Sequence, residues 1–332
     1  MTVTFVEAVW QGVVILFGAT LLGMVYKGFD RKLAAQMQGR IGPPIRQPFY
    51  DFVKLMVKEN VVPEHAVGWL YNLMPIVALV AAATLLFYIP LGGFGPLLGG
   101  FGDLILILYL LAIPSLAMVV GGFAAGSPYA TVGAQREMVM MMAYEFPLAV
   151  ALVSLAWRLS AVLPGAHVFS LSVLSMNPLW GVVGPLGVIG LALLFLALLI
   201  VMPGELAKIP FDIPEAETEI AGGLMAEYSG RNFAMFYLAD AIKMVVMASL
   251  AVALFVPYGL ANVFGLAGTF WGGLIDVVFY LVKVFLVIFV SVITVRVGFA
   301  RLKIGQATRL FWLPVTGISL LGLLLLTFDR FV

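Results

Sequence analysis

Residues 182–202 read VVGPLGVIGLALLFLALLIVM and contain no charged side chain. A helix of about 20 apolar residues is long enough to span the hydrocarbon core of a bilayer. The rest of the chain has the same character, because 63% of its 332 residues are hydrophobic, only 11% are charged, and the mean hydropathy is +1.12. A soluble globular domain is far more polar. The sequence therefore predicts an all-α, polytopic integral membrane protein.

Apolar runs of similar length recur along the chain, and several of them are interrupted by proline or glycine. We expect about eight transmembrane helices in a single membrane domain covering residues 1–332. The first run has no basic segment before it and no small-residue cleavage site after it, so we expect it to stay as a helix. The expected spans are roughly 5–26, 70–90, 104–125, 137–157, 182–202, 233–256, 274–295 and 310–328.

The chain has no cysteine and only two histidines, His65 and His167. Iron–sulfur clusters need several thiolate ligands, and two histidines about a hundred residues apart argue against a zinc or bis-histidine haem site. We expect both histidines to be ordinary residues at helix ends. No catalytic centre, metal or cofactor site is therefore expected in this chain, and a partner would have to carry electrons in any redox chemistry.

Basic residues are distributed unevenly over the predicted loops. Most of the 18 lysines and arginines fall on one side of the membrane. The positive-inside rule places that side in the cytoplasm, together with the long loops 27–69 and 203–232. An even number of spans then places both termini outside the cell membrane. The basic residues found elsewhere are Arg158, Arg330, Lys243 and Lys283.

One cytoplasmic loop concentrates carboxylates. Residues 208–230 read KIPFDIPEAETEIAGGLMAEYSG, with Glu205 just before them. A helix with Asp212 as N-cap and Glu215 closing a capping box would place Glu215 and Glu219 on one face. A solvated helix explains the first two acids, since carboxylates favour helix N-termini, but it leaves the last three without a basic partner. The alternative is the mouth of a charge pathway. The acids are Asp212, Glu215, Glu217, Glu219 and Glu227.

Ionisable side chains also occur within the predicted spans, where they cost several kcal/mol unless they are paired or solvated. Asp240 and Lys243 are spaced i, i+3 and could pair, while Asp276 and Lys283 share a helix face. Glu137 lies at the cytoplasmic edge of its span, and Pro147 frees a backbone carbonyl near the deeper Glu145. Two interpretations stay open: buried salt bridges that hold helices in register, or a hydrated file that passes protons or another cation.

The other cytoplasmic loop contains residues 39–59, GRIGPPIRQPFYDFVKLMVKE. Its first part is rich in turn-forming residues, and its second part interleaves apolar and charged residues, which predicts a short amphipathic helix. That helix could lie on lipid or under a docked partner. The candidate docking residues are Arg40, Pro43, Pro44, Arg46, Gln47, Pro48, Asp51, Lys54, Lys58 and Glu59.

Three segments carry a family resemblance: residues 39–59, GAQREMVMMMAYEFPL (133–148) and IPFDIPEAETEIAGGLMAEYSGRNFAMFYLAD (209–240). Over nearly its whole length the chain resembles the H-type membrane subunits of NADH:quinone oxidoreductase (respiratory complex I) and the homologous membrane anchor of energy-converting group 4 nickel–iron hydrogenases. The compact GPPIRQP stretch, and Asp240 where complex I members usually have Glu, resemble the hydrogenase-type branch, whose members use no quinone.

The resemblance implies a membrane anchor and coupling subunit that links a cytoplasmic electron-transfer module to H⁺ or Na⁺ translocation. It implies as partners a large hydrogenase-like catalytic subunit, a small iron–sulfur subunit, antiporter-like and small membrane subunits, and the lipid bilayer, but no nucleic acid. Iron–sulfur clusters and a NiFe-type or derived centre would lie in those partners. Loops 27–69 and 203–232 would form the docking surface. The acids that match the family's pathway are Glu137, Glu145, Asp212, Glu215, Glu217, Glu219 and Glu227.

Other functions stay open at this point. One is the quinone-site membrane subunit of an NADH:quinone oxidoreductase, and another is the equivalent subunit of a membrane-bound sulfur-reducing or formate-oxidising complex. A stand-alone secondary transporter is a further alternative, but it predicts inverted internal repeats that are not evident in the sequence. The sequence also leaves open the terminal electron acceptor and the coupling ion.

Overall fold

The computed structural model describes residues 5–92, 95–165, 167–261, 263–266 and 268–331, and it is helical throughout these ranges apart from turns, loops and one short bridge. Within them, eight helical segments are long and apolar enough to cross a membrane, which confirms the predicted class and number of spans. The segments are α1 (Phe5–Met37), α3 (Gly68–Leu86), α4 (Leu104–Ala124), α5 (Pro128–Val162), α7 (Pro185–Glu205), α9 (Gly230–Phe255), Phe270–Gly298 and Ile304–Phe331.

Two of these helices run well beyond the apolar segments that the sequence indicates. Helix α1 continues to Met37, eleven residues past the predicted end at 26. Helix α5 begins at Pro128 rather than at 137, and proline is favoured in a first helical turn because it has no N–H to leave unpaired. Hydropathy marks only the lipid-facing length of a helix, so polar extensions outside the bilayer escape it.

The last two spans each contain one turn of wider π-helix. The first consists of α10 (Phe270–Ile288), the π segment η4 (Phe289–Ile293) and α11 (Thr294–Gly298). The second consists of α12 (Ile304–Leu310), the π segment η5 (Phe311–Val315) and α13 (Thr316–Phe331). Pro314 lies within η5 and cannot donate the backbone bond of a regular helix.

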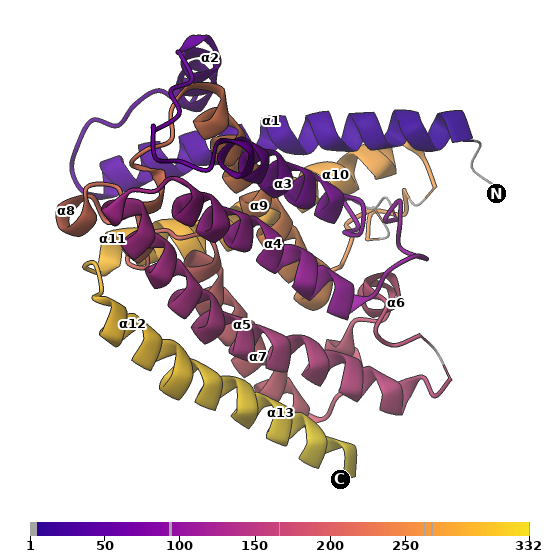
Figure 1. Cartoon of the computed structure of the whole chain (residues 1–332). Helices are drawn as coiled ribbons and strands as arrows, with labels where there is room; N and C mark the ends of the chain where they lie inside the picture. Colours follow the sequence, from indigo (N-terminus) through magenta and orange to yellow (C-terminus); the bar gives the residue numbers. More distant parts are fainter. Residues whose placement is uncertain (1–4, 93–94, 166, 262, 267, 332) are drawn as a thin grey trace.

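Helix α9 lies at the centre of the bundle (Figure 1). In its apolar stretch 89% of the residues are buried, compared with 22% for α1, and it packs against α1, α3, α7 and α10. Small side chains allow such close packing. At one crossing a Cβ on Gly23 of α1 would overlap the backbone carbonyl of Ala241 in α9. This central position carries Asp240 and Lys243 into the protein interior.

The extramembrane elements gather at the two ends of the bundle (Figure 1). One end carries α2 (Gln47–Val57) and the segment between α7 and α9, which contains η2 (Ile213–Glu215), α8 (Glu217–Ile220) and η3 (Gly223–Met225). The opposite end carries both chain termini, α6 (Leu171–Met176) and η1 (Leu179–Gly181). Helix α2 confirms the predicted amphipathic helix.

The segment 206–229, here called the acidic loop, does not form the single capped helix that we expected. Asp212 makes no capping hydrogen bond, and the chain forms three short helical turns instead. The backbone takes positive φ values at Ala221, Gly222 and Gly223, which a continuous right-handed helix cannot accommodate. A Cβ at Gly223 would overlap the carbonyl of Pro214, so the loop folds tightly back on itself.

Candidate functional site: a charged cavity beneath the acidic loop

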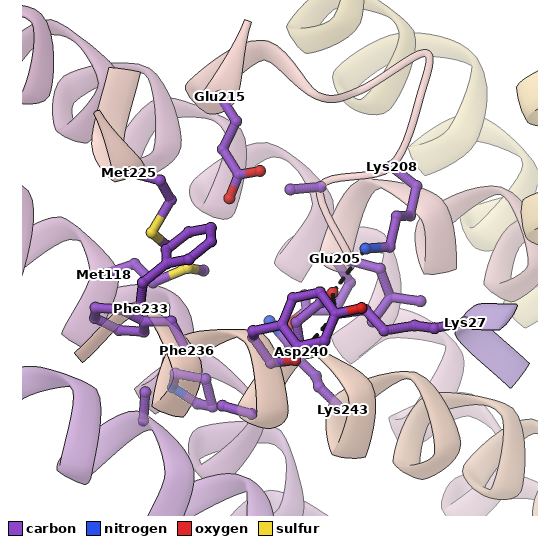
Figure 2. Close-up of a pocket in the computed structure, with 16 residues that line it drawn as sticks. Lys27, Met118, Glu205, Lys208, Glu215, Met225, Phe233, Phe236, Asp240 and Lys243 are labelled. Carbon is purple, nitrogen blue, oxygen red and sulfur yellow. Dashed lines mark hydrogen bonds and ion pairs between the residues drawn. The ribbon is translucent and has the colours of Figure 1, made fainter. Parts of the chain in front are cut away.

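A small cavity lies between the acidic loop and the inner part of the bundle (Figure 2). Its volume is about 100 Å³, which is enough for several water molecules. Its walls combine apolar side chains, such as Met118 and Phe236, with six acidic or basic ones. We call it the charged cavity. The acidic and basic residues that line it are Lys27, Glu205, Lys208, Glu215, Asp240 and Lys243.

Asp240 of α9 joins two lysines at one side of the charged cavity. Its Oδ2 atom lies 2.7 Å from Lys27 Nζ, contributed by α1, and 2.8 Å from Lys208 Nζ, contributed by the acidic loop. Lys27 also donates to the carbonyl of Tyr237, and its ammonium lies 3.6 Å from the centre of the Tyr237 ring. The expected pair between Asp240 and Lys243 is therefore wrong, because Asp240 binds cations from two other elements.

Lys243 points instead to Glu205, the last residue of α7. Its Nζ atom lies 2.7 Å from Glu205 Oε1 and donates to Ser115 Oγ of α4 at 2.8 Å. The side chains of Lys243 and Glu205 are only 3% and 2% exposed, so the pair is withdrawn from water. Sequence reasoning left Glu205 outside the expected pathway. The signal that could have found it was its place at the end of a long apolar run, directly before the acidic loop.

The polar contacts continue from Ser115 to Glu137. The Tyr144 hydroxyl lies 3.3 Å from Ser115 Oγ and 3.3 Å from Glu137 Oε1. Glu137 is 2% exposed, so it is not a solvated residue at the membrane edge. Nine further residues of α5 precede the predicted start of this span, so Glu137 does not lie at a helix end. We call the set Glu205, Lys243, Ser115, Tyr144 and Glu137 the buried polar chain.

Glu145 lies two turns further along α5 than Glu137. It is half-buried, it interacts electrostatically with Glu205 and Lys243, and its buried Oε1 atom has no hydrogen-bond partner among the described residues. Buried carboxylate oxygens are normally hydrogen-bonded. The Glu145 carboxylate therefore keeps one oxygen free to accept a hydrogen bond from a group outside the described residues.

The acids of the acidic loop have different surroundings. Glu215 points into the charged cavity (Figure 2), whereas Glu217 is exposed and Glu227 is half-buried. Asp212 pairs with Arg301 at 2.9 Å, and Glu219 pairs with Arg136 of α5 at 2.6 Å. The expectation that Glu219 lacks a basic partner is therefore wrong, because the partner comes from a distant part of the sequence.

Burial changes the proton affinities of this loop. It raises the pKa of Glu215, although the nearby Lys208 opposes the change. It also raises the pKa of Asp212, against the effect of Arg301. For Lys208 burial alone would lower the pKa, but the Asp240 carboxylate outweighs it and the pKa is raised. The charged cavity thus places a carboxyl group with a raised pKa near an ammonium group whose pKa is also raised.

Asp276 and Lys283 do not reach the charged cavity. They line a separate pocket of about 260 Å³. Lys283 donates to the carbonyls of Val256 and Tyr258 at 2.8 and 2.7 Å. Asp276 Oδ1 accepts from the backbone N–H groups of Leu260 at 2.7 Å and Ala261 at 2.9 Å. Both side chains therefore hold the segment that follows α9, and a role in ion movement stays a prediction for them.

The candidate docking residues lie on and around α2. Asp51 pairs with Arg31 at 2.6 Å and accepts from Gln47 at 2.9 Å, which ties α2 to α1. Pro48 is buried, and Pro43, like Asp51 and Gln47, is half-buried. Beside them α2 exposes an apolar stripe at Tyr50, Val53, Met56 and Val57. The exposed candidates are Arg40, Pro44, Arg46, Lys54, Lys58 and Glu59.

Among the residues that the structure describes, no group of three or more His, Cys, Asp or Glu side chains is arranged to hold a metal ion. His65 and His167 are both exposed, far apart in the sequence.

Comparison with known proteins places the chain in a family. It matches the NADH dehydrogenase family over residues 10–327. It is 37% identical to hydrogenase-4 component C of Escherichia coli K12 over 262 residues, 78% of each chain. It is 31% identical to the H-type membrane subunit of NADH-quinone oxidoreductase from Geobacillus kaustophilus HTA426, over 95% of this chain and 94% of that one.

A solved structure shows the same fold. A chain of the membrane-bound sulfane sulfur reductase, an archaeal respiratory membrane complex, superposes with a TM-score of 0.82 at 30% identity, covering 96% of this chain and 99% of that chain. Sequence and architecture thus agree over almost the full length. The protein belongs to the NADH dehydrogenase family of integral membrane subunits.

Proposed function

We propose that this chain is the membrane anchor and coupling subunit of a complex I-related, energy-converting oxidoreductase of the hydrogenase-like type. It links a cytoplasmic electron-transfer module to the movement of H⁺ or Na⁺. The observation that carries the proposal is the line of ionisable groups that runs from Glu215 through the charged cavity and the buried polar chain to Glu145.

A purely structural role explains this line poorly. Buried ion pairs are weak sources of stability, because the desolvation of both charges offsets most of their attraction. A polar network built for stability would satisfy all its members, since each unpaired buried group weakens it. Here Glu145 keeps an unpaired oxygen, and Glu215 faces the cavity with no ion pair among the described residues. These features support groups that change partners or protonation state.

The surroundings of this line of ionisable groups support a subunit that binds a cytoplasmic partner. The acidic loop and α2 lie at the same end of the bundle, where most of the basic residues also lie. The exposed apolar stripe of α2 supports a protein partner on this end. By the positive-inside rule this end faces the cytoplasm and both termini lie outside the cell membrane. The hydrogenase-like catalytic subunit, the iron–sulfur subunit and their metal centres are proposed to dock here.

Two of the comparisons support the hydrogenase-like branch over a quinone-site subunit. The 37% identity to a hydrogenase-4 component and the similarity to a sulfane sulfur reductase chain support the same branch.

Purification of the tagged chain from its native membranes in mild detergent tests the proposal. We expect mass spectrometry to find a hydrogenase-like large subunit, a small iron–sulfur subunit and antiporter-like membrane subunits in stoichiometric amounts. A photoreactive quinone analogue should not label this chain in a saturable way. If the chain instead purifies alone and moves ions across liposomes without a redox partner, it is a secondary transporter and the proposal fails.

A further inference from the structure

The last span begins with a groove that the pathway does not use. Residues of α12 and η5 line an open groove of about 740 Å³ at the end of the bundle that carries the acidic loop. On the inner side of this helix Ala307, Phe311 and Val315 are fully buried against the bundle. The groove lies on the opposite face. Its main lining residues are Lys303, Gln306, Arg309, Leu310, Leu313 and Pro314.

The groove changes from charged to apolar along its length. Gln306, Arg309, Leu310 and Leu313 follow the i, i+3, i+4, i+7 spacing of one helix face. The polar members precede the apolar ones, and Leu313 is 65% exposed. From Lys303 to Leu313 the helix rises about 15 Å, at roughly 1.5 Å per residue. This is about half the thickness of a hydrocarbon core, so the groove leads from the membrane surface into one leaflet.

The positive charge of the groove is not neutralised within the protein. Two carboxylates at this end of the bundle are already occupied, because Asp212 pairs with Arg301 and Asp30 pairs with Arg296. Lys303 and Arg309 are exposed, and neither forms an ion pair with any residue that the structure describes. No acidic side chain lines the groove within the described part of the chain. Two free cations therefore face an uncovered site at the membrane surface.

Gly305 lies in the first turn of α12, and the space where its side chain would stand is empty. The turn itself is capped within the chain, because the Lys303 backbone N–H donates to Gln306 Oε1 at 3.0 Å and the Gln306 N–H donates to the Lys303 carbonyl at 2.9 Å. The side chains of Lys303 and Arg309 therefore provide the place for a phosphate group, and the apolar wall beyond them suits an acyl chain.

From this arrangement we propose that the groove binds one anionic phospholipid, with its phosphate between Lys303 and Arg309 and an acyl chain along Leu310, Leu313 and Pro314. A soluble phosphate would gain nothing from the apolar wall. A neutral phospholipid would leave the two cations without a counter-charge. Only a lipid that carries net negative charge matches both parts of the groove.

Native mass spectrometry of the purified full-length chain tests this site. The probes are long-chain phosphatidylglycerol, phosphatidylcholine with the same acyl chains, and free glycerol phosphate. We expect one phosphatidylglycerol to bind selectively. The variant Lys303→Gln/Arg309→Gln should bind it roughly thirtyfold more weakly, since each basic residue near a membrane surface contributes about a kilocalorie per mole toward anionic lipid. The control Arg231→Gln removes an exposed charge outside the groove and should bind as the unaltered chain does.

Several results would overturn the proposal. Equal binding of phosphatidylcholine would show a non-selective lipid contact, and equal binding of glycerol phosphate would show a simple anion site. An unchanged affinity in the groove variant, or an equal loss in the control, would exclude Lys303 and Arg309. A photo-crosslinking amino acid at Leu313 in native membranes should capture a phospholipid, and capture of a protein would identify the groove as a subunit interface instead.

Discussion

At the scale of single residues, the buried ion pair between Lys243 and Glu205 is the contact on which the stability of the fold depends most. Both side chains are almost fully buried and lie 2.7 Å apart. Each charge depends on the other, because an unpaired ion in a low-dielectric interior is very unfavourable. Ser115 provides a further acceptor for the lysine at 2.8 Å. The pair therefore ties the end of α7 to the centre of α9 beside the charged cavity.

A double-mutant cycle tests this dependence. We expect Lys243→Met to lower stability by about 3 kcal/mol or more, because it leaves the Glu205 carboxylate buried without a counter-charge. Glu205→Gln added to Lys243→Met should restore much of the loss, since the remaining pair is neutral. Thermal unfolding of the detergent-solubilised protein would measure the stability of Lys243→Met, of Glu205→Gln and of the double variant. If the double variant loses as much stability as the two single variants together, the residues do not act as a pair.

At the scale of elements, the acidic loop shows the limit of reading structure from local sequence. The eight spans follow from hydropathy alone, and α2 follows from its alternation of apolar and charged residues. The loop has an equally clear local pattern, Asp212 followed three residues later by Glu215, yet no capping box forms. Asp212 pairs with Arg301, far along the chain, and the glycines at 222 and 223 redirect the backbone. Tertiary contacts overrode the local signal.

The same limit explains the residues that sequence reasoning missed or paired wrongly. Asp240 and Lys243 have the correct spacing to pair within a helix, but Lys27 and Lys208 approach Asp240 from two other elements. Spacing along one helix cannot show which side chains of other helices lie nearby. Glu205 was left out of the predicted pathway for the related reason that its partner, Lys243, lies on another helix far along the chain. The resemblance of the three segments to a known family identified the region but not these contacts.

Arg136 is expected to hold the acidic loop in place without stabilising the whole protein. It pairs with Glu219 and donates to the carbonyl of Ile213 at 3.4 Å. Partly exposed ion pairs contribute about 0–1 kcal/mol, so Arg136→Gln should leave the unfolding temperature nearly unchanged. Hydrogen exchange in residues 213–221 should become faster. The control Arg231→Gln removes an exposed charge from the start of α9 and should alter exchange in the loop little. Unchanged exchange in the Arg136 variant would show that other contacts fix the loop.

At the scale of the whole molecule, the ionisable residues predicted within the spans fall into one line and one separate cluster. The line begins at Glu215, passes the charged cavity, and reaches Glu137 and Glu145 on α5. Asp276 and Lys283 are held apart from it, where they fix the segment after α9. The sequence predicts the pathway residues as one set, from their positions in the acidic loop and the spans and from the family resemblance. The structure brings only some of them together, since that depends on how the helices pack around α9.

The most direct test of the coupling role compares ion movement with electron transfer in one variant. Glu145→Gln keeps the size of the side chain and removes its titratable carboxyl group. The control Glu64→Gln makes the same change at an exposed carboxylate outside the line. Membrane vesicles that contain the assembled complex would report the ion gradient and the rate of electron transfer to a soluble acceptor. We expect Glu145→Gln to assemble and transfer electrons almost normally while its ion gradient falls sharply, and Glu64→Gln to retain both. A Glu145→Gln variant that builds a normal gradient would contradict the proposed pathway, and one that fails to assemble would assign Glu145 a structural role.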